Sequence, residues 1–143
     1  GIANINCTAG RRLNKAQIDK VTNCDYISHR HNIIIMGASD AGKSYLAYTY
    51  GMEAYKQFYS VKYVRLPELF TKLAIARGEG VYKKVLHQYR KVNLLILDEW
   101  IFVSLTETEA RDVLELIQAR HRRASTVFCS QFSPAGWHAK ISE

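Results

Sequence analysis

The chain is poor in cysteine and has no long apolar run. Its three cysteines, Cys7, Cys24 and Cys129, are widely spaced and form no Cys-x-x-Cys pair. This argues against a disulfide framework or a cysteine zinc site and is typical of a reducing compartment. No apolar stretch approaches the ~20 residues that cross a bilayer, and no secretory signal is visible, so we expect a cytoplasmic protein without membrane contact. Internal repeats and low-complexity tracts are also lacking, and we expect a single domain over 1–143.

Acidic residues are in the minority, with 13 Asp and Glu against 20 Lys and Arg and a net charge of +7. A basic balance is compatible with nucleic-acid binding, but many basic domains bind none, so the placement of the charges matters more. One cluster lies in the middle of the chain and comprises Lys72, Arg77, Lys83, Lys84, His87, Arg90 and Lys91. A second cluster, 120–123, ends a later helical pattern, where it would also complement the helix dipole. A structural and a functional role are both open for this second cluster.

Residues 37–44 read GASDAGKS and match the P-loop pattern GxxxxGK[ST]. They follow an apolar run directly and lead into a helical pattern, so the strand–loop–helix context of the motif is present. The two glycines permit close approach of the backbone, whose amides then face phosphate at a helix N-terminus. Lys43 would reach the β- and γ-phosphates, and Ser44 would ligate Mg²⁺. The alternative is a plain glycine-rich turn with a solvated lysine. The residues expected to hold the nucleotide are Gly37, Ala38, Ser39, Asp40, Ala41, Gly42, Lys43 and Ser44.

The run LLILDE at 94–99 has the pattern of a Walker B strand. A continuous apolar run that ends in carboxylates is typical of a central parallel strand, and ligands bind at the carboxyl edge of such sheets. Asp98 would hold Mg²⁺, often through water, and Glu99 would orient and deprotonate the attacking water. Two adjacent carboxylates repel each other unless a cation binds one of them or a proton neutralises it, so that the two have different roles. The alternative is a strand that simply turns into solvent.

Strand and helix patterns alternate along the chain, which predicts a parallel sheet with right-handed crossovers. Thr106 and Glu109 form a capping-box pattern, and the helical stripes place Phe58 and Leu114 among the inward-facing residues. Helices are expected at about 15–22, 43–58, 66–77 and 81–90 and from Thr106 onward, and strands at 32–36, 61–65, 92–97 and 125–129.

Two helices are expected between the strands at 61–65 and 92–97, where a minimal crossover needs one. They carry most of the mid-chain basic charge. They are either an inserted interaction element or a helical hairpin that only covers the sheet.

The order of five segments resembles the IstB-like family: GASDAGKSYLA, VKYVRLPELFTKL, LLILDEW, ELIQAR and STVFCSQFSPAGW. This family comprises the ATP-binding helper proteins of one class of bacterial insertion sequence. It is similar to the DnaC-like helicase loaders, and both belong to the AAA+ ATPases. The resemblance covers roughly residues 11–143. It implies an α/β fold, a P-loop NTPase of the AAA+ core type built as a three-layer sandwich with a mainly parallel sheet.

The resemblance implies ATP and Mg²⁺ as cofactors and gives the motif residues their roles. Lys43 would contact the phosphates, Asp98 the metal and Glu99 the water. Gln131, beside Ser130, takes the position of the polar sensor that contacts the γ-phosphate. The family more often shows Asn there, and Gln offers the same amide donor. By similarity, segment 11–31 would lie near the adenine.

The family's arginine finger and its small helical lid usually follow the sensor strand and are expected beyond this chain. The chain begins with Gly1 and ends soon after Trp137, so we expect further sequence on both sides in the natural protein. Without finger and lid the domain should hydrolyse ATP slowly, because an arginine supplied in trans contributes about 10³–10⁵ in rate.

The resemblance also implies a function. Subunits would assemble with ATP on duplex DNA as a homo-oligomer and recruit or activate a transposase, with hydrolysis resetting the complex. A helicase loader that acts on single-stranded DNA is the main alternative. A metabolite kinase is a third, although no second phosphate-binding arginine motif is evident. The residues expected along the DNA path are Lys72, Arg77, Lys83, Lys84, Arg90 and Lys91.

Overall fold

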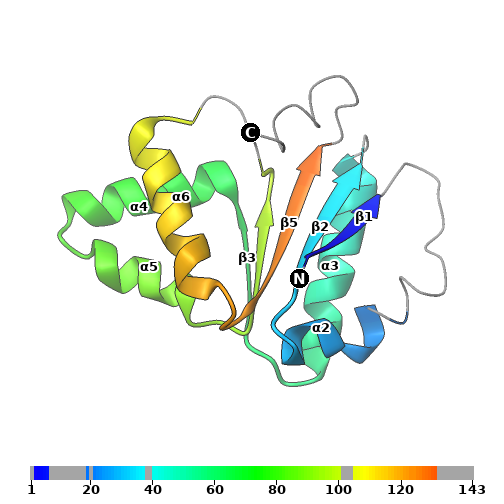
Figure 1. Ribbon diagram of the computed structural model, residues 1–143. Helices are drawn as coiled ribbons and strands as arrows, with labels where there is room; N and C mark the ends of the chain where they lie inside the picture. The colour runs from blue at the N-terminus through cyan, green and yellow to red at the C-terminus, as the bar shows by residue number, and fades with distance from the viewer. Residues whose placement is uncertain (1, 7–18, 20, 38–39, 101–104, 132–143) are drawn as a thin grey trace.

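The computed structural model describes residues 2–6, 19, 21–37, 40–100 and 105–131. Strands and helices alternate along most of this chain (Figure 1). In chain order the elements are β1 (Ile2–Asn6), α2 (Asp25–Ser28), β2 (Asn32–Gly37), α3 (Asp40–Lys56), β3 (Val61–Arg65), α4 (Leu66–Gly78), α5 (Tyr82–Arg90), β4 (Leu94–Asp98), α6 (Glu107–Arg120) and β5 (Ser125–Gln131).

The five strands form one sheet in the order β1-β2-β5-β4-β3, and every pair is parallel. The strand β2 that precedes the P-loop and the Walker B strand β4 therefore lie on either side of β5. Gly37 lies opposite Gln131 in the register, and Arg65 lies opposite Asp98. All these residues end their strands, so the candidate site residues gather at one edge of the sheet.

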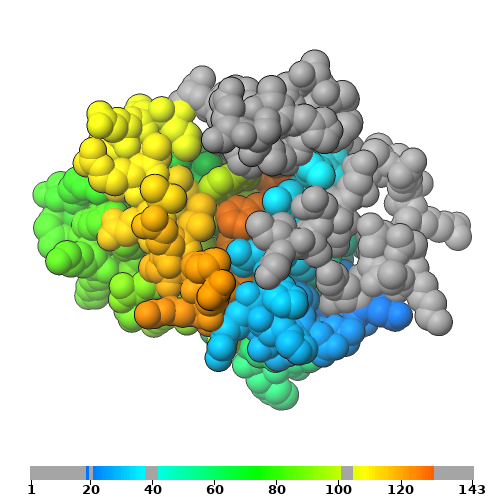
Figure 2. Space-filling view, viewed as in Figure 1, coloured from blue at the N-terminus to red at the C-terminus, as the bar shows by residue number. Residues whose placement is uncertain are grey.

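The sheet has helices on both faces, which confirms the three-layer α/β fold. One core lies under α3 and α2 and includes Ile33, Ile35 and Ile96. The other lies under α4, α5 and α6 and includes Leu95 and Leu97. Successive residues of β4 thus enter opposite cores, as expected for a central strand covered on both sides. Figure 2 shows α4, α5 and α6 as one continuous block on this side of the molecule.

Local sequence signals explain where several helices begin. α4 starts at Leu66 with Pro67 in its first turn, where the missing amide hydrogen costs nothing. The capping box of α6 is present: the Glu109 N–H donates to the Thr106 hydroxyl at 3.1 Å, and the Thr106 N–H donates to the Glu109 carboxylate at 2.9 Å. Gly80, in the break between α4 and α5, has φ +76°, a conformation that favours glycine.

Several sequence expectations need correction. Phe58 is 97% exposed because α3 already ends at Lys56. Leu114 is exposed; Val113 is buried as expected, and α6 turns Leu116 rather than Leu114 into the core.

Element bounds also differ. β4 begins two residues later than expected, and β5 continues to Gln131. The sequence pattern missed β1, whose alternating asparagines give little apolar signal. The helix expected over 15–22 falls mostly outside the described residues, of which 19 and 21–23 are helical.

Candidate functional site

The P-loop lysine lies at the start of α3. Ala38 and Ser39 are outside the described residues, but β2 ends at Gly37 and α3 begins at Asp40, so Gly42 and Lys43 lie in the first turn and Ser44 follows directly. Lys43 is only 3% exposed, which is rare for a lysine. The helix N-terminus beside it supplies amide donors and a positive dipole end. A phosphate placed there would meet both.

The Asp98 carboxylate is held from two directions. It is 7% exposed at the end of β4. Its Oδ1 accepts the N–H of Glu99 at 2.8 Å, and its Oδ2 accepts the hydroxyl of Tyr63 from the neighbouring strand β3. The two donors fix the orientation of the carboxylate, and its remaining lone pairs can still reach a metal or a metal-bound water. Burial, followed by this hydrogen bond to Asp98, raises the pKa of the Tyr63 hydroxyl, so it remains a donor at neutral pH.

Glu99 lies at a sharp turn just after β4. Its φ of 54° is in the left-handed region, which is uncommon for residues other than glycine and is often found at functional sites. The carboxylate is half exposed, and Arg65 at the end of β3 approaches it at 4.0 Å. Arg65 also approaches Glu68 at 3.8 Å, and such exposed pairs are weak. Glu99 therefore follows Asp98 at the same edge of the sheet, and its carboxylate is held loosely.

Gln131 ends β5 directly opposite Gly37, so its backbone is at the same edge of the sheet. Its neighbour Ser130 is buried and donates from Oγ to the carbonyl of Trp100 at 2.9 Å. The Trp100 N–H in turn donates to the carbonyl of Cys129 at 2.7 Å. Ser130 thus ties the chain after β4 to β5, and the sensor role expected of Gln131 stays a prediction.

The donor set fits Mg²⁺ with ATP. In the described part of the chain no group of three or more His, Cys, Asp or Glu could hold a metal ion. Mg²⁺ needs no such cage, because it keeps several waters and binds one or two carboxylates together with substrate phosphates. Asp98, the Ser44 hydroxyl and the phosphates would form this set.

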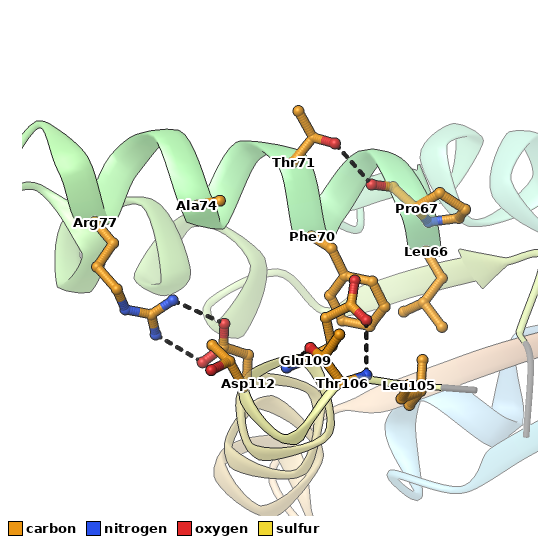
Figure 3. Close-up of a pocket in the computed structure, with 11 residues that line it drawn as sticks. Leu66, Pro67, Phe70, Thr71, Ala74, Arg77, Leu105, Thr106, Glu109 and Asp112 are labelled. Carbon is orange, nitrogen blue, oxygen red and sulfur yellow. Dashed lines mark hydrogen bonds and ion pairs between the residues drawn. The ribbon is translucent and has the colours of Figure 1, made fainter. Parts of the chain in front are cut away.

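Arg77 makes a contact within the protein that the sequence did not predict. Its guanidinium makes a bidentate ion pair with Asp112 of α6, at 2.8 and 3.2 Å, and lies over the ring of Tyr82 at 4.2 Å. Tyr82 also donates to Asp112 at 3.0 Å. Figure 3 shows the Arg77 side chain reaching Asp112 beside a cavity of about 760 Å³ between α4 and α6. Arg77 therefore fastens the α4–α5 hairpin to α6, and since its side chain is also partly exposed, its expected DNA contact stays a prediction.

Arg120 has a structural role. It is buried, and it donates to the backbone carbonyls of Tyr89, Arg90, Val92 and Ser125 and to the Thr126 hydroxyl, at 2.7–3.1 Å. Burial lowers its pKa to about 10, so it is still charged at neutral pH. The open question about this residue is thereby resolved, while His121, Arg122 and Arg123 are exposed.

The remaining basic residues of the mid-chain cluster are exposed. They are Lys72 on α4, Lys83, Lys84, His87 and Arg90 on α5, and Lys91 just after it. Lys72 pairs with Glu68 at 3.3 Å. Sequence reasoning missed Lys62 of β3, whose ammonium lies 5.4 Å from the ring centre of Tyr89 on α5 and extends this basic surface. It also missed Tyr63 and Arg65, because only the pairing of β3 with β4 brings them to Asp98 and Glu99.

No helix in the described ranges is long and apolar enough to cross a membrane.

The fold and the two motifs define an ATP-binding P-loop domain of the AAA+ type. Solved structures with this fold include the DnaC helicase loader, with a TM-score of 0.72 and 17% identity over 94% of this chain and 81% of that one. Another is AMPPCP-bound DnaA from Aquifex aeolicus, with a TM-score of 0.73 and 20% identity over 87% of this chain and 41% of that one.

The chain belongs to the family of IstB-like ATP-binding proteins, because the sequence model of this family matches residues 1–143. It is 40% identical over 131 residues to y4pL of Sinorhizobium fredii, described as an insertion sequence ATP-binding protein, which covers 92% of this chain and 54% of y4pL. It is 38% identical over 122 residues to the ATP-binding protein of insertion sequence IS1162 from Pseudomonas fluorescens, covering 85% of this chain and 53% of that protein. The chain thus spans about half the length of these relatives.

Proposed function

We propose that this chain is the ATP-binding and ATP-hydrolysing module of a cytoplasmic helper protein for DNA transposition. One observation carries the proposal: a buried P-loop lysine and a pre-oriented Walker B carboxylate meet at one sheet edge in a chain whose relatives are insertion sequence ATP-binding proteins.

Each site residue would have its own role in ATP binding and hydrolysis. The amides of 37–44 and Lys43 bind the phosphates, while Ser44 and Asp98 hold the metal. Glu99 takes a proton from the attacking water, and the Gln131 amide donates to the γ-phosphate. Mg²⁺, when bound, neutralises charge on the phosphate oxygens. An arginine from a neighbouring subunit completes the site, so that this domain by itself turns over slowly.

The surface of α5 supplies the DNA contacts. Lys83, Lys84, Arg90 and Lys91 are exposed there, and Lys62 and Lys72 lie beside α5 on β3 and α4. Lysines and arginines without a recognition helix contact phosphates and read little sequence. We therefore propose that a homo-oligomer of the full-length protein assembles on duplex DNA with little sequence preference and recruits or activates a transposase.

Sedimentation of the full-length protein tests this function. ATP, compared with ADP, should drive growth into a large particle when duplex DNA is added, and Lys43→Ala should abolish that growth. Preference for single-stranded DNA, or assembly only with a replicative helicase, would support a helicase loader instead. Absence of any nucleotide effect would reject both.

A further inference from the structure

Tyr63 contacts the Walker B carboxylate from outside both sequence motifs. It lies on β3, opposite Ile96 of β4, and its ring leans along the strand so that the hydroxyl donates to Oδ2 of Asp98. The residue is 49% exposed, and β3 ends the described sheet. The ring of Tyr63 therefore contributes little to the core. Its hydroxyl, in contrast, has a defined hydrogen-bond partner.

Ser44 and Tyr63 line the same cavity of about 450 Å³, together with Tyr48, Tyr55 and Ile96. The metal-binding hydroxyl expected in the P-loop and the phenol that holds Asp98 therefore border one space. Tyr63 closes the β3 side of that space.

The two hydrogen bonds fix one orientation of the carboxylate. Oδ1 accepts from Glu99 and Oδ2 from Tyr63, so rotation of the carboxylate would break both bonds. A carboxylate has about four lone-pair sites, so each oxygen can still accept from a metal-bound water or bind the metal itself. Groups that orient a metal ligand in this way tune metal affinity.

We infer that Tyr63 is a positioning residue for the metal–nucleotide complex: its hydroxyl holds Asp98 in the orientation that binds Mg²⁺ beside the phosphates. This rests on the proposed function, since it assumes that the P-loop binds ATP with Mg²⁺. Tyr63 touches neither the nucleotide nor the reacting water and acts only through Asp98.

Mn²⁺ binding to the full-length protein tests the inference without relying on turnover. The protein is loaded with a non-hydrolysable ATP analogue, and free Mn²⁺ is followed by electron paramagnetic resonance. Tyr63→Phe should weaken Mn²⁺ binding by about 10-fold, as is usual when a group behind a metal ligand is lost. Affinity for the analogue in EDTA should stay at the wild-type value, because the P-loop holds the phosphates. Unchanged or tighter Mn²⁺ binding would overturn the inference, and an equal loss in EDTA would show general damage instead.

Two further variants sharpen the result. In an Asp98→Asn background, Tyr63→Phe should cause little further loss of Mn²⁺ affinity, because the carboxylate that it orients is gone. Fully additive losses of Mn²⁺ affinity would show that Tyr63 acts independently of Asp98. Tyr55→Phe is the matched control: this exposed tyrosine lines the same cavity from α3, and its loss should leave Mn²⁺ binding unchanged. If the wild type binds no analogue, the proposed function fails and the inference with it. If the wild type binds analogue and Mn²⁺ but Tyr63→Phe matches it, only the inference fails.

Discussion

Replacing Arg120 by Met should strongly destabilise the domain. The guanidinium makes five hydrogen bonds, four of them to backbone carbonyls, and methionine fills a similar volume but donates none. A buried acceptor left without a donor costs about 1–3 kcal/mol, and several would be created together. The variant also no longer buries the charged guanidinium, and the desolvation cost that it avoids offsets part of this loss. We therefore expect a decrease of about 3–5 kcal/mol in the free energy of unfolding, because several buried acceptors lose their charged donor at once.

Urea unfolding measures this effect. With an m-value of about 2 kcal/mol/M, the midpoint should fall by about 2 M while m stays constant. Arg120→Lys keeps the charge but loses the planar set of donors, so it should lie between the wild type and Arg120→Met. Arg123→Met, at an exposed arginine of the same cluster, is the control and should leave the midpoint unchanged. A decrease below about 0.5 M for Arg120→Met would refute this account and reopen a functional role for the residue.

Two other predictions concern α5 and α6. The double change Lys83→Ala and Lys84→Ala should weaken DNA binding by similar factors on unrelated sequences and reduce the slope of log K against log salt by about 1.8, measured by fluorescence anisotropy. Lys56→Ala, on α3 across the sheet, is its control, and an unchanged slope for the double variant would remove this part of α5 from the DNA path. Thr106→Ala should remove the α6 capping box and lower stability by about 1 kcal/mol, seen as a decrease of about 2–4 °C in the melting temperature. Thr108→Ala, at an exposed position in the first turn of α6, should lower the melting temperature less, and equal decreases would show that loss of the cap is not the cause.

The sequence was sufficient for features that depend on local pattern. The two helices between β3 and β4 and the capping box of α6 lie where the pattern predicts them, and the Walker B strand lies within two residues of its predicted start, because each is specified by neighbouring residues. The parallel sheet and its two covered faces follow from the alternation of strands and helices.

Features that depend on strand order or on distant contacts were missed or misjudged. Nothing in the sequence shows that β3 lies beside β4, so the contact of Tyr63 with Asp98 could not be foreseen. The ion pair of Arg77 with Asp112, 35 positions later, could not be foreseen either, because it depends on the packing of α4 against α6. Leu114 and Leu116 fit the same helical pattern about equally well, and only the packing of α6 distinguishes them.

The order of the strands also bears on how the protein folds. β2 and β4 do not pair with each other; each pairs with β5, the last described strand to be synthesised. Ile33 must therefore find Val127 across more than half of the chain, a non-local contact of the kind that slows folding. On the ribosome, β2 can pair with β1 and β4 with β3 early, but these two halves of the sheet, one leading into the helix of Lys43 and the other ending in Asp98, can join only when β5 has emerged and inserted between β2 and β4.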